Sequence, residues 1–494
     1  MLDNFILGAG LVFQLPRLGL IFVGVVFGII VGAIPGMTAT MAIALLIPLT
    51  FGIHPIDGMA LMMGTYVGGI TGGLISATLI NIPGTPSSIA TTFDAYPLTQ
   101  KGQGGKALGT GITASFIGGI FSLVILCAVA PQLAKVALKF GPYEYFSVGL
   151  FSLAIIITLS EGSLLKGILA GLFGILMGTI GIAPVDGAPR FTMGIEPLIG
   201  GLDLLPILIG LFAIPEILGS LESLGEKFTV ETQVKDMFPK ARDVISNWWN
   251  YLRAALIGTG IGILPGIGGG TSNLVAYAEA KRASKHPEEF GKGAIEGIIA
   301  SETANNASVG GALVPLLSLG IPGDTVTAML IGGLMIHGLQ PGPLLFQTNA
   351  DVVYSIFMSL FVANIMMLVL MFGGIKFFIK AMEVPKHILL PLLSVLCILG
   401  TYATNNRMFD VWTMFVFGLV GYFFQKNRFP QTPMILGLIL GPIVETNLRR
   451  GLMHSGALPF FTRPISLAFL ILAVIFAVSS LRKGIKGEKA SAAA

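Results

Sequence analysis

Long stretches without an acidic or basic residue constrain the fold of this chain more than any other feature of its sequence. Leu18 to Phe51 and Gly58 to Phe93 contain no Asp, Glu, Lys or Arg, and similar runs recur toward the C-terminus. A transmembrane helix needs about 20 predominantly apolar residues, so several of these runs are long enough for at least one crossing. The sequence therefore predicts a membrane protein that crosses the bilayer many times.

The composition excludes most other classes of protein. Only 11% of the 494 residues are charged and 54% are hydrophobic, whereas a soluble domain carries about 25% charged residues. A net charge of +4 gives no electrostatic footprint for nucleic acid, and two cysteines do not make a disulfide scaffold. The chain has 66 glycines and 28 prolines, and both residues are common in membrane helices.

We expect an all-α polytopic membrane protein with roughly 10 to 13 transmembrane or re-entrant helical elements. Some apolar runs exceed the length of one helix and are interrupted by Pro-Gly pairs, and others are too short for a complete crossing. The runs are apolar on all sides, which is typical of helices surrounded by lipid and protein.

Charged residues separate two apolar halves of the chain and mark its end. We expect an N-terminal transmembrane repeat over 1–219, a polar connector over 220–250, a C-terminal transmembrane repeat over 251–481 and a basic cytoplasmic tail over 482–494. Trp248, Trp249 and Tyr251 lie at the end of the connector, as is typical of a membrane interface. The N-terminus lacks the basic start of a cleavable signal, so we expect the first span to stay in the mature protein.

Two motifs occur twice in the same order. Gly28-x3-Gly32-Ala33-Ile34-Pro35-Gly36 recurs as Gly258-x3-Gly262-Ile263-Leu264-Pro265-Gly266. Ile82-Pro83-Gly84-Thr85 recurs as Ile321-Pro322-Gly323-Asp324. The offsets are 230 residues from Pro35 and 239 residues from Pro83. Each Pro-Gly pair alone is an ordinary turn signal, but the ordered pairs indicate an internal duplication.

Positive charges on the flanks predict that the two copies are inverted. After the first motif, the first copy reaches His54 to Gly58 without Lys or Arg, whereas its echo reaches Lys281-Arg282. After the second motif the bias reverses, because the first copy reaches Lys101 and Lys106 and its echo runs from His337 to Asp351 with neither. Positive residues mark the cytoplasmic side, so corresponding ends face opposite sides, as inverted repeats require.

The Pro-Gly pairs are expected to break membrane helices. Proline removes a backbone donor and clashes with the preceding turn, and glycine permits a sharp change of direction. The helix that starts after a break presents free N–H groups and a positive dipole end, which attract carboxylates. The helix that ends there presents free carbonyl groups, which coordinate Na⁺ in other carriers. The predicted breaks are Pro35, Gly36, Pro83, Gly84, Pro265, Gly266, Pro322 and Gly323.

Small polar residues next to these breaks, together with two asparagines that precede an apolar run, are our candidates for binding a substrate: Thr38, Asn81, Thr85, Ser87, Ser88, Thr271, Ser272, Asn273, Asn305, Asn306 and Thr325. Their hydroxyl and amide groups cap helices and donate to anions. Candidates for a cation site are Gly36, Gly266, Gly323 and Asp324. The alternative for any one of them is ordinary packing, since small and hydroxyl residues also line helix–helix contacts in membranes.

Two acidic residues stand in or next to apolar runs. Asp324 is the only charged residue between Thr303 and Ala350, and it either binds a cation or caps the next helix. Glu302, with Asn305 and Asn306, precedes an apolar run and faces either a substrate cavity or the membrane rim.

Motifs typical of enzymes are missing from the sequence. It contains no G-x-x-x-x-G-K-[ST] loop, no H-E-x-x-H pair, no metal-ligand cluster and no G-x-S-x-G elbow. We therefore expect that the chain is not an enzyme and holds no resident cofactor or metal, apart from a possible Na⁺.

Several longer stretches carry a family resemblance: Asn81-Ile-Pro-Gly-Thr-Pro-Ser-Ser88, Pro189-Arg-Phe-Thr-Met-Gly194, Ala280 to Gly293, Glu302-Thr-Ala-Asn-Asn306 and His337-Gly-Leu-Gln-Pro-Gly-Pro343. With them the chain resembles the large permease subunit, the TctA family, of the bacterial tripartite tricarboxylate transporters, over about residues 18 to 460. The chain departs from the family at two points. It has Thr38-Ala39 where family members often have glycine and proline, and Asp324 where they often have serine.

The resemblance implies a secondary active transporter subunit in the bacterial inner membrane. Its substrates would be di- or tricarboxylates such as citrate, and Na⁺ or H⁺ would be the coupling ion. Its partners would be a small membrane subunit and a periplasmic solute-binding protein. Two alternatives remain open, namely a passive anion channel and a structural membrane anchor of a multi-subunit complex.

The predicted inverted repeat can be tested with topology reporters, which show the side of the membrane on which a residue lies. A topology reporter fused at residue 56 and one fused at residue 285 should lie on opposite sides of the membrane, because these positions end the two copies of the first motif. Alkaline phosphatase and green fluorescent protein fusions measure this directly. Activity on the same side at both positions would contradict the inversion.

Overall fold

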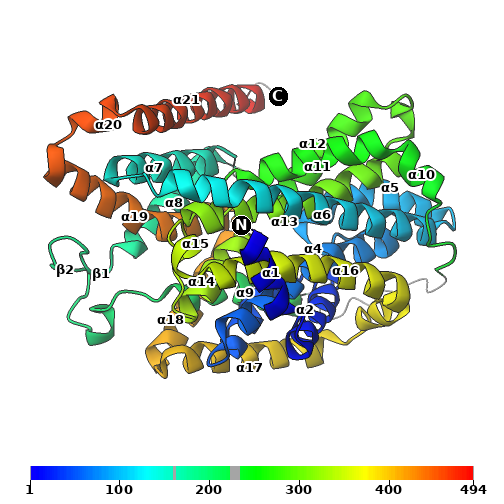
Figure 1. Cartoon of the computed structure of the whole chain (residues 1–494), viewed down its shortest axis with the longest axis horizontal. Helices are drawn as coiled ribbons and strands as arrows, with labels where there is room; N and C mark the ends of the chain where they lie inside the picture. Colours follow the sequence, from blue (N-terminus) through cyan, green and yellow to red (C-terminus); the bar gives the residue numbers. More distant parts are fainter. Residues whose placement is uncertain (1, 160–162, 223–233, 493–494) are drawn as a thin grey trace. The chain divides into compact units, whose positions relative to one another are not determined.

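A computed structural model describes residues 2–159, 163–222 and 234–492, without the side chains of residues 156–159 and 480–492. Almost every element in this part of the chain is a helix, and Figure 1 shows a single short pair of strands, β1 and β2, within it. The predicted all-α class is therefore confirmed. Residues 223–233 of the predicted connector and residues 493–494 of the predicted tail lie outside the described residues.

The chain forms two compact units, each built from separate segments. Unit 1 comprises Met1–Ala134, Glu216–Ile263 and Ile267–Thr404, and unit 2 comprises Lys135–Pro215, Leu264–Gly266 and Asn405–Ala494. The helices of unit 1 are α1 (Leu2–Val12), α2 (Leu15–Ala33), α3 (Ala39–Leu46), η1 (Ile47–Thr50), α4 (Pro55–Ile80), η2 (Pro86–Ser88), α5 (Ile89–Gln100), α10 (Ala241–Ser246), α11 (Trp248–Ile263), α12 (Gly268–Ala283), η4 (Pro287–Glu289), α13 (Ile295–Leu319), α14 (Thr325–Ile336), α15 (Leu345–Thr348) and α16 (Ala350–Ala381).

Three further helices contain a boundary between the units: α6 (Gly104–Ala137), α9 (Leu204–Glu222) and α17 (Lys386–Asn405). Unit 2 contains α7 (Pro142–Leu159), α8 (Leu164–Gly178), β1 (Gly181–Ile182), β2 (Pro189–Arg190), η3 (Glu196–Leu198), α18 (Met408–Lys426), α19 (Gln431–Ser455), α20 (Leu458–Thr462) and α21 (Pro464–Ala492).

Helices suited to crossing a membrane run through the whole described chain. Seven are long and apolar enough to cross one, namely α2, α4, α6, α9, α16, α17 and α18. Five shorter apolar helices accompany them, at Leu2–Val12, Ala39–Thr50, Leu164–Gly178, Thr325–Ile336 and Pro464–Ser479. Together these elements agree with the polytopic membrane protein that the sequence predicts.

The duplicated motifs correspond to the same succession of elements in unit 1. Helix α2 ends at Ala33 and α11 ends at Ile263, and both ends precede a Pro-Gly pair. Helix α4 ends before Asn81, and α13 ends before Gly320. Both of these capping residues have a left-handed backbone, with φ of 59° and 74°, and a proline follows two residues later, as is common after such helix ends. At each of the four Pro-Gly pairs one helix ends and another begins.

Glycines let the first helix of each copy pack directly on the backbone of the next one. A Cβ atom built on Gly28 of α2 would lie 2.5 Å from the carbonyl oxygen of Thr65 in α4. A Cβ atom on Gly262 of α11 would lie 2.6 Å from the carbonyl oxygen of Ser308 in α13. Such small-residue contacts drive helix association in membranes, where there is no hydrophobic force between helices.

The second Pro-Gly pair of each copy rests on the helix that precedes the first pair. A Cβ atom on Gly84 would collide with the carbonyl oxygen of Gly32 at the end of α2. A Cβ atom on Gly323 would lie 2.6 Å from the carbonyl oxygen of Gly262 at the end of α11. The two breaks of one copy are therefore stacked on each other, and glycine is required at both contacts.

Helices α4 and α13 form the centre of unit 1, and they cross several neighbours (Figure 1). The side chains of α13 are buried from Gly297 to Ser318, although this stretch contains Glu302, Asn305 and Asn306. Gly118 of α6 contacts the backbone of Thr303, so α6 also lies against α13. Polar groups on α13 thus face other helices of unit 1.

An ion-pair network anchors the β1–β2 hairpin of unit 2. Gly181 pairs with Arg190 in this antiparallel hairpin, and both terminal nitrogens of Arg190 donate to the carboxylate of Glu445 on α19, at 2.6 and 3.2 Å. Arg449, one turn further along α19, donates to Asp186 at 2.9 Å. This hydrogen bond lowers the pKa of the Asp186 carboxyl. The loop is thereby fixed to α19 by bidentate geometry.

The glycine contact of α11 predicts a stability difference between two neighbouring glycines. Gly262→Ala should destabilise the protein by about 1–3 kcal/mol, because the added methyl group meets only backbone atoms of α13. Gly260→Ala on the same helix has nothing within 4 Å of the added methyl group, so it should be neutral or slightly stabilising. Thermal unfolding in detergent, followed by size-exclusion chromatography, compares the two. Equal melting temperatures would contradict the close contact.

Candidate functional site

The segments that follow the four breaks lie together in unit 1. The hydroxyl groups of Thr40 in α3 and Thr325 in α14 are 2.8 Å apart. A Cβ atom on Gly268, the first residue of α12, would lie 3.0 Å from the Cβ atom of Asp324. A Cβ atom on Gly269 would lie 2.9 Å from the Cβ atom of Ser87 in η2. Each of these segments thus contacts at least one of the others.

Three of the four helix starts are capped by a side chain of their own chain segment. Thr38 accepts from the backbone N–H of Met41 at 3.1 Å, and Asp324 accepts from the N–H of Thr327 at 2.7 Å. Thr85 forms a capping box with Ser88. Helix α12 differs, since its N-cap residue is Ile267 and no side chain caps it. The first N–H groups of any helix have no partner within it, and at α12 no side chain of the described residues caps them. We call α12 the open helix start of the four.

Buried amide and hydroxyl groups surround the start of α12. A Cβ atom on Gly269 would lie 2.9 Å from Oδ1 of Asn305 and 3.1 Å from Oγ of Ser308. Asn305 is fully buried, and neither its amide nitrogen nor its oxygen has a hydrogen-bond partner among the described residues. Asn273 donates to the carbonyl oxygen of Ser87, and its own oxygen has no partner in the same part of the chain. Unpartnered buried amides are costly, so this cluster has unused capacity for a polar ligand.

Asp324 uses its carboxylate within the protein. Oδ1 accepts from the N–H of Thr327 at 2.7 Å and from its hydroxyl group at 2.6 Å. Oδ2 accepts from the hydroxyl group of Tyr66 in α4 at 2.6 Å. The sequence left two roles open for Asp324, cation binding and helix capping, and its hydrogen bond from the N–H of Thr327 is that of a helix cap.

A carboxylate of the chain itself lies at the start of α3. The backbone N–H of Thr38 donates to Oε2 of Glu216 in α9 at 3.3 Å. The free N–H groups of a helix start favour negative charge. Glu216 therefore occupies one of the helix starts at which the sequence predicts a substrate carboxylate.

The polar groups of two predicted site residues form hydrogen bonds with neighbouring elements. Ser272 donates to the carbonyl oxygens of Gly269 and Ala304, at 3.0 and 3.3 Å. Asn306 accepts from Thr71 at 2.8 Å and donates to the carbonyl oxygen of Glu302 at 3.1 Å. These two side chains therefore fasten helices together.

The remaining candidates differ in exposure. Asn81 is exposed at the end of α4, and none of the described contacts joins it to the cluster at α12. Thr38, Thr271 and Thr325 are partly exposed at the starts of α3, α12 and α14. Three of the helix starts that follow the breaks are therefore not fully enclosed by the protein.

Glu302 lies inside the protein, on the α13 turn that precedes Asn305. Its side chain is fully buried. Oε1 accepts from the hydroxyl group of Thr91 in α5 at 2.5 Å, and Oε2 accepts from that of Ser115 in α6 at 3.0 Å. The alternative of a position at the membrane rim does not fit this burial.

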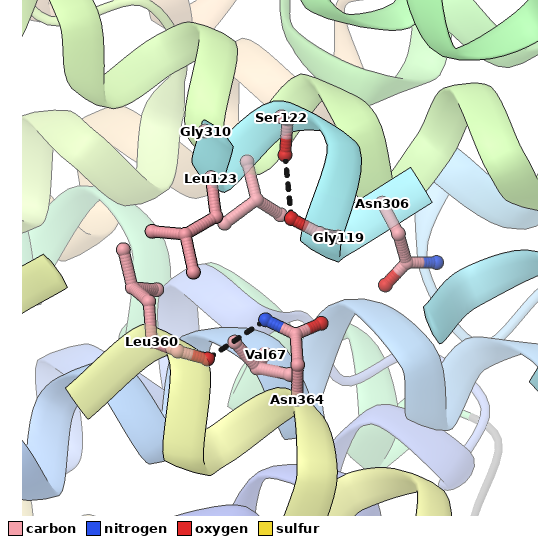
Figure 2. Close-up of a pocket in the computed structure, with 9 residues that line it drawn as sticks. Val67, Gly119, Ser122, Leu123, Asn306, Gly310, Leu360 and Asn364 are labelled. Carbon is pink, nitrogen blue, oxygen red and sulfur yellow. Dashed lines mark hydrogen bonds between the residues drawn. The ribbon is translucent and has the colours of Figure 1, made fainter. Parts of the chain in front are cut away.

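A small cavity lies on the far side of Asn306. Figure 2 shows Asn306 of α13 and Asn364 of α16 among the residues that line it, with Ser122 of α6 nearby. Its volume is about 10 Å³, which is about the space of one water molecule. This cavity is too small for a carboxylate substrate.

The comparison with known proteins agrees with the predicted resemblance. The model of the family described as "Tripartite tricarboxylate transporter TctA family" matches residues 18–436. The chain belongs to the tripartite tricarboxylate transporter TctA family. Membership in this family, together with the apolar helices, makes the chain a multi-pass membrane subunit of a tripartite transporter. The family is one of transporter subunits, which points away from an enzyme.

Two relatives of this TctA-family chain come from Agrobacterium vitis. One, named "Uncharacterized 52.8 kDa protein in TAR-I ttuC' 3'region", is 35% identical over 470 residues, which cover 95% of this chain and 94% of the relative. The other, named "Uncharacterized protein in TAR-II ttuC' 3'region", is 33% identical over 234 residues, which cover 47% of this chain and 97% of the relative. No solved structure matches the chain.

Some residues of this candidate site were not found from the sequence. Tyr66, which donates to Asp324, is one tyrosine within a long apolar run and gives no signal in the sequence. Thr40 and Ser308 read as ordinary packing residues. Glu216 was detectable, because it directly follows an uncharged apolar run that ends at Pro215.

The cap at α14 predicts how substitutions of Asp324 affect stability. Asp324→Ala removes the acceptor for the N–H of Thr327 and should cost about 0.5–2 kcal/mol. Asp324→Asn keeps an acceptor oxygen at the same position, so it should retain most of the stability. Thermal unfolding in detergent measures both. A melting temperature of the alanine variant equal to that of the asparagine variant would contradict the capping role.

Proposed function

We propose that this chain is the transport subunit of a secondary carrier that imports di- or tricarboxylates, citrate-like acids, across the bacterial inner membrane. In this proposal, substrate arrives from a periplasmic solute-binding protein and a small membrane subunit accompanies the chain. Na⁺ or H⁺ is the coupling ion. Family membership supports the tripartite assembly, and the cluster at α12 supports an acidic substrate.

The observation that carries the proposal is the start of α12, which no side chain of the described residues caps, beside the amide of Asn305, which has no partner among the same residues. Free N–H groups at a helix start attract anions through hydrogen bonds and through the helix dipole. Gly270 is partly exposed, and a Cβ atom there would have no neighbour closer than the carbonyl oxygen of Pro86 at 3.7 Å, so a carboxylate can approach the start of α12 from the side of this glycine. Two further polar side chains lie at this helix start, namely the amide of Asn305, which has no partner among the described residues, and Ser87, whose hydroxyl group lies 3.0 Å from that of Thr85.

The other breaks have supporting roles in this proposal. The starts of α3 and α14 already hold the carboxylates of Glu216 and Asp324. Thr38 and Thr325, both partly exposed, remain candidates for a second carboxylate of a di- or tricarboxylate. Carbonyl groups around Gly36, Gly266 and Gly323 are candidates for Na⁺, as at the broken helices of other carriers.

Transport requires that the site face each side of the membrane in turn. In inverted-repeat carriers, one repeat-derived part moves against another around a fixed central site. We extend this model to the two copies found here and place the C-terminus on the cytoplasmic side, in line with its basic residues. A channel would lack saturation and gradient coupling, which separates that alternative from a carrier.

The site predicts a transport defect for Asn305→Ala. Hydrogen bonds to charged groups contribute about 1.5–3 kcal/mol, so losing one donor should reduce substrate affinity by about 10- to 100-fold. Uptake of radiolabelled citrate, succinate and malate by proteoliposomes that contain the whole complex measures this effect. The binding protein shows in a parallel screen which of these acids it delivers.

A matched control tests whether the loss of any membrane amide has the same effect. Asn447 on α19 in unit 2 donates to the carbonyl oxygen of Ile443 on its own helix, and Asn447→Ala should leave uptake unchanged. Normal uptake by the Asn305→Ala protein would remove the α12 cluster from the site. Uptake without saturation in the wild type would contradict a carrier.

A further inference from the structure

We propose that Glu302 is the site at which this carrier binds the coupled proton. The inference rests on the proposed function, because a coupling site has meaning only in a carrier. It goes further by naming H⁺ as the coupling ion and one carboxyl group as its binding site.

The surroundings of Glu302 favour a neutral carboxyl group over an ion pair. The side chain is fully buried between α13, α5 and α6, and its hydrogen-bond partners Thr91 and Ser115 are fully buried as well. Both partners are uncharged. A buried carboxylate without a cation pays a large desolvation cost, and binding a proton removes that cost.

No charged group on the helices packed against Glu302 forms an ion pair with its carboxylate in the described part of the chain. The charged and titratable groups on the packed elements are Asp57 and Tyr66 on α4, Asp94 and Tyr96 on α5, Lys106, Cys127 and Lys135 on α6, Tyr251 and Arg253 on α11, Tyr277, Glu279, Lys281 and Arg282 on α12, Glu296 on α13, and Asp324 at the start of α14. Within the described residues none of these groups forms an ion pair with Glu302. The acid nearest in sequence to Thr91 on α5 is Asp94. Its Oδ1 accepts from three backbone N–H groups between Gly291 and Ala294, so this oxygen is hydrogen-bonded away from Glu302.

A chain of hydroxyl groups beside Glu302 fits both protonation states. Oγ1 of Thr91 lies 2.5 Å from Oε1 of Glu302 and 3.1 Å from Oγ of Ser301, which lies 3.2 Å from the carbonyl oxygen of Ile298. When Glu302 is protonated, it donates to Thr91, Thr91 donates to Ser301, and Ser301 donates to Ile298. When Glu302 is ionised, Ser301 donates to Thr91, and Thr91 donates to Glu302. Each hydroxyl group uses its single hydrogen in both cases, so rotating two hydroxyl groups accommodates the proton.

The same elements connect Glu302 to the anion site. Glu302 precedes Asn305 by one turn of α13, and Thr91 follows Ser87 and Ser88 by one turn at the start of α5. A proton on Glu302 removes a negative charge close to the bound carboxylate. Proton and substrate therefore favour each other's binding, and thermodynamic linkage makes this effect reciprocal. The proton enters with the substrate from one side and leaves with it on the other, so no further reactant is needed.

The pH dependence has a defined sign. Substrate affinity should fall as pH rises through the range in which Glu302 loses its proton, because the ionised carboxylate repels the substrate. Glu302→Gln, which resembles the protonated acid, should bind substrate with an affinity that is independent of pH in this range.

The test uses the whole complex in proteoliposomes loaded with a fluorescent pH indicator, with citrate, succinate and malate as probes. Wild-type complex should move protons inward with substrate and accumulate substrate when a pH gradient is imposed. Glu302→Gln should lose both and keep the exchange of labelled substrate at equal concentrations on the two sides. The control Glu296→Gln alters an acid on the same helix, one and a half turns away, and should behave as wild type. Proton movement by Glu302→Gln at the wild-type level, or uptake driven by Na⁺ alone in the wild type, would overturn the proposal.

Infrared spectroscopy of the purified complex tests the site without transport. The wild type should show the band of a buried protonated carboxyl group at neutral pH, and Glu302→Gln should lack it. Thr91→Val, which interrupts the hydroxyl chain, should shift the pH at which the band disappears; this variant decides the question if Glu302→Gln does not fold. An unchanged band in both variants would overturn the inference. If the wild type moves none of the probes but the band behaves as stated, the proposed function fails and the proton site stands.

Discussion

Helices α2 and α11 can approach α4 and α13 because glycines on one helix face the backbone of the other. With no hydrophobic force between helices in lipid, contacts at this distance and hydrogen bonds have to hold the bundle together. Gly28 and Gly262 make equivalent contacts in the two copies, and Gly84 and Gly323 bring the second break of each copy onto the helix that leads to the first. The position of every break thus depends on these contacts.

Once the breaks are brought together, the helix starts that follow them become different from one another. The starts of α3, α14 and η2 are capped by Thr38, Asp324 and Thr85. Helix α12 begins with glycines and has no side-chain cap, and the amide of Asn305 lies beside it without a partner in the described chain. The recurring motifs thus give four similar helix starts, and three of them have a side-chain cap of their own, which is why we propose the fourth, at α12, for an acidic ligand.

The centre of unit 1 is polar although it is buried. Along α13, Glu302, Asn305 and Asn306 face other helices. Hydroxyl groups of α5 and α6 donate to Glu302, and a hydroxyl group of α4 donates to Asn306. Intramembrane polar groups are expensive, and they are therefore found where function needs them. The carboxyl group of Glu302 and the amide of Asn305 lie about one turn apart on the same helix, and our proposed coupling between proton and substrate uses this short separation.

The sequence by itself determined the all-α membrane class, the family, the duplication and the place of every break, because apolar run length and Pro-Gly pairs act locally along the chain. It also singled out Asn305 and Glu302 as polar residues beside an apolar run. Only the tertiary structure decided which candidates stay open. Ser272 and Asn306 form hydrogen bonds with other helices, and Asp324 caps its own helix and accepts from Tyr66. Asn305 has no hydrogen-bond partner among the residues that the structure describes. The reason is physical, since a polar side chain's partner is set by helix packing between residues that are distant in sequence.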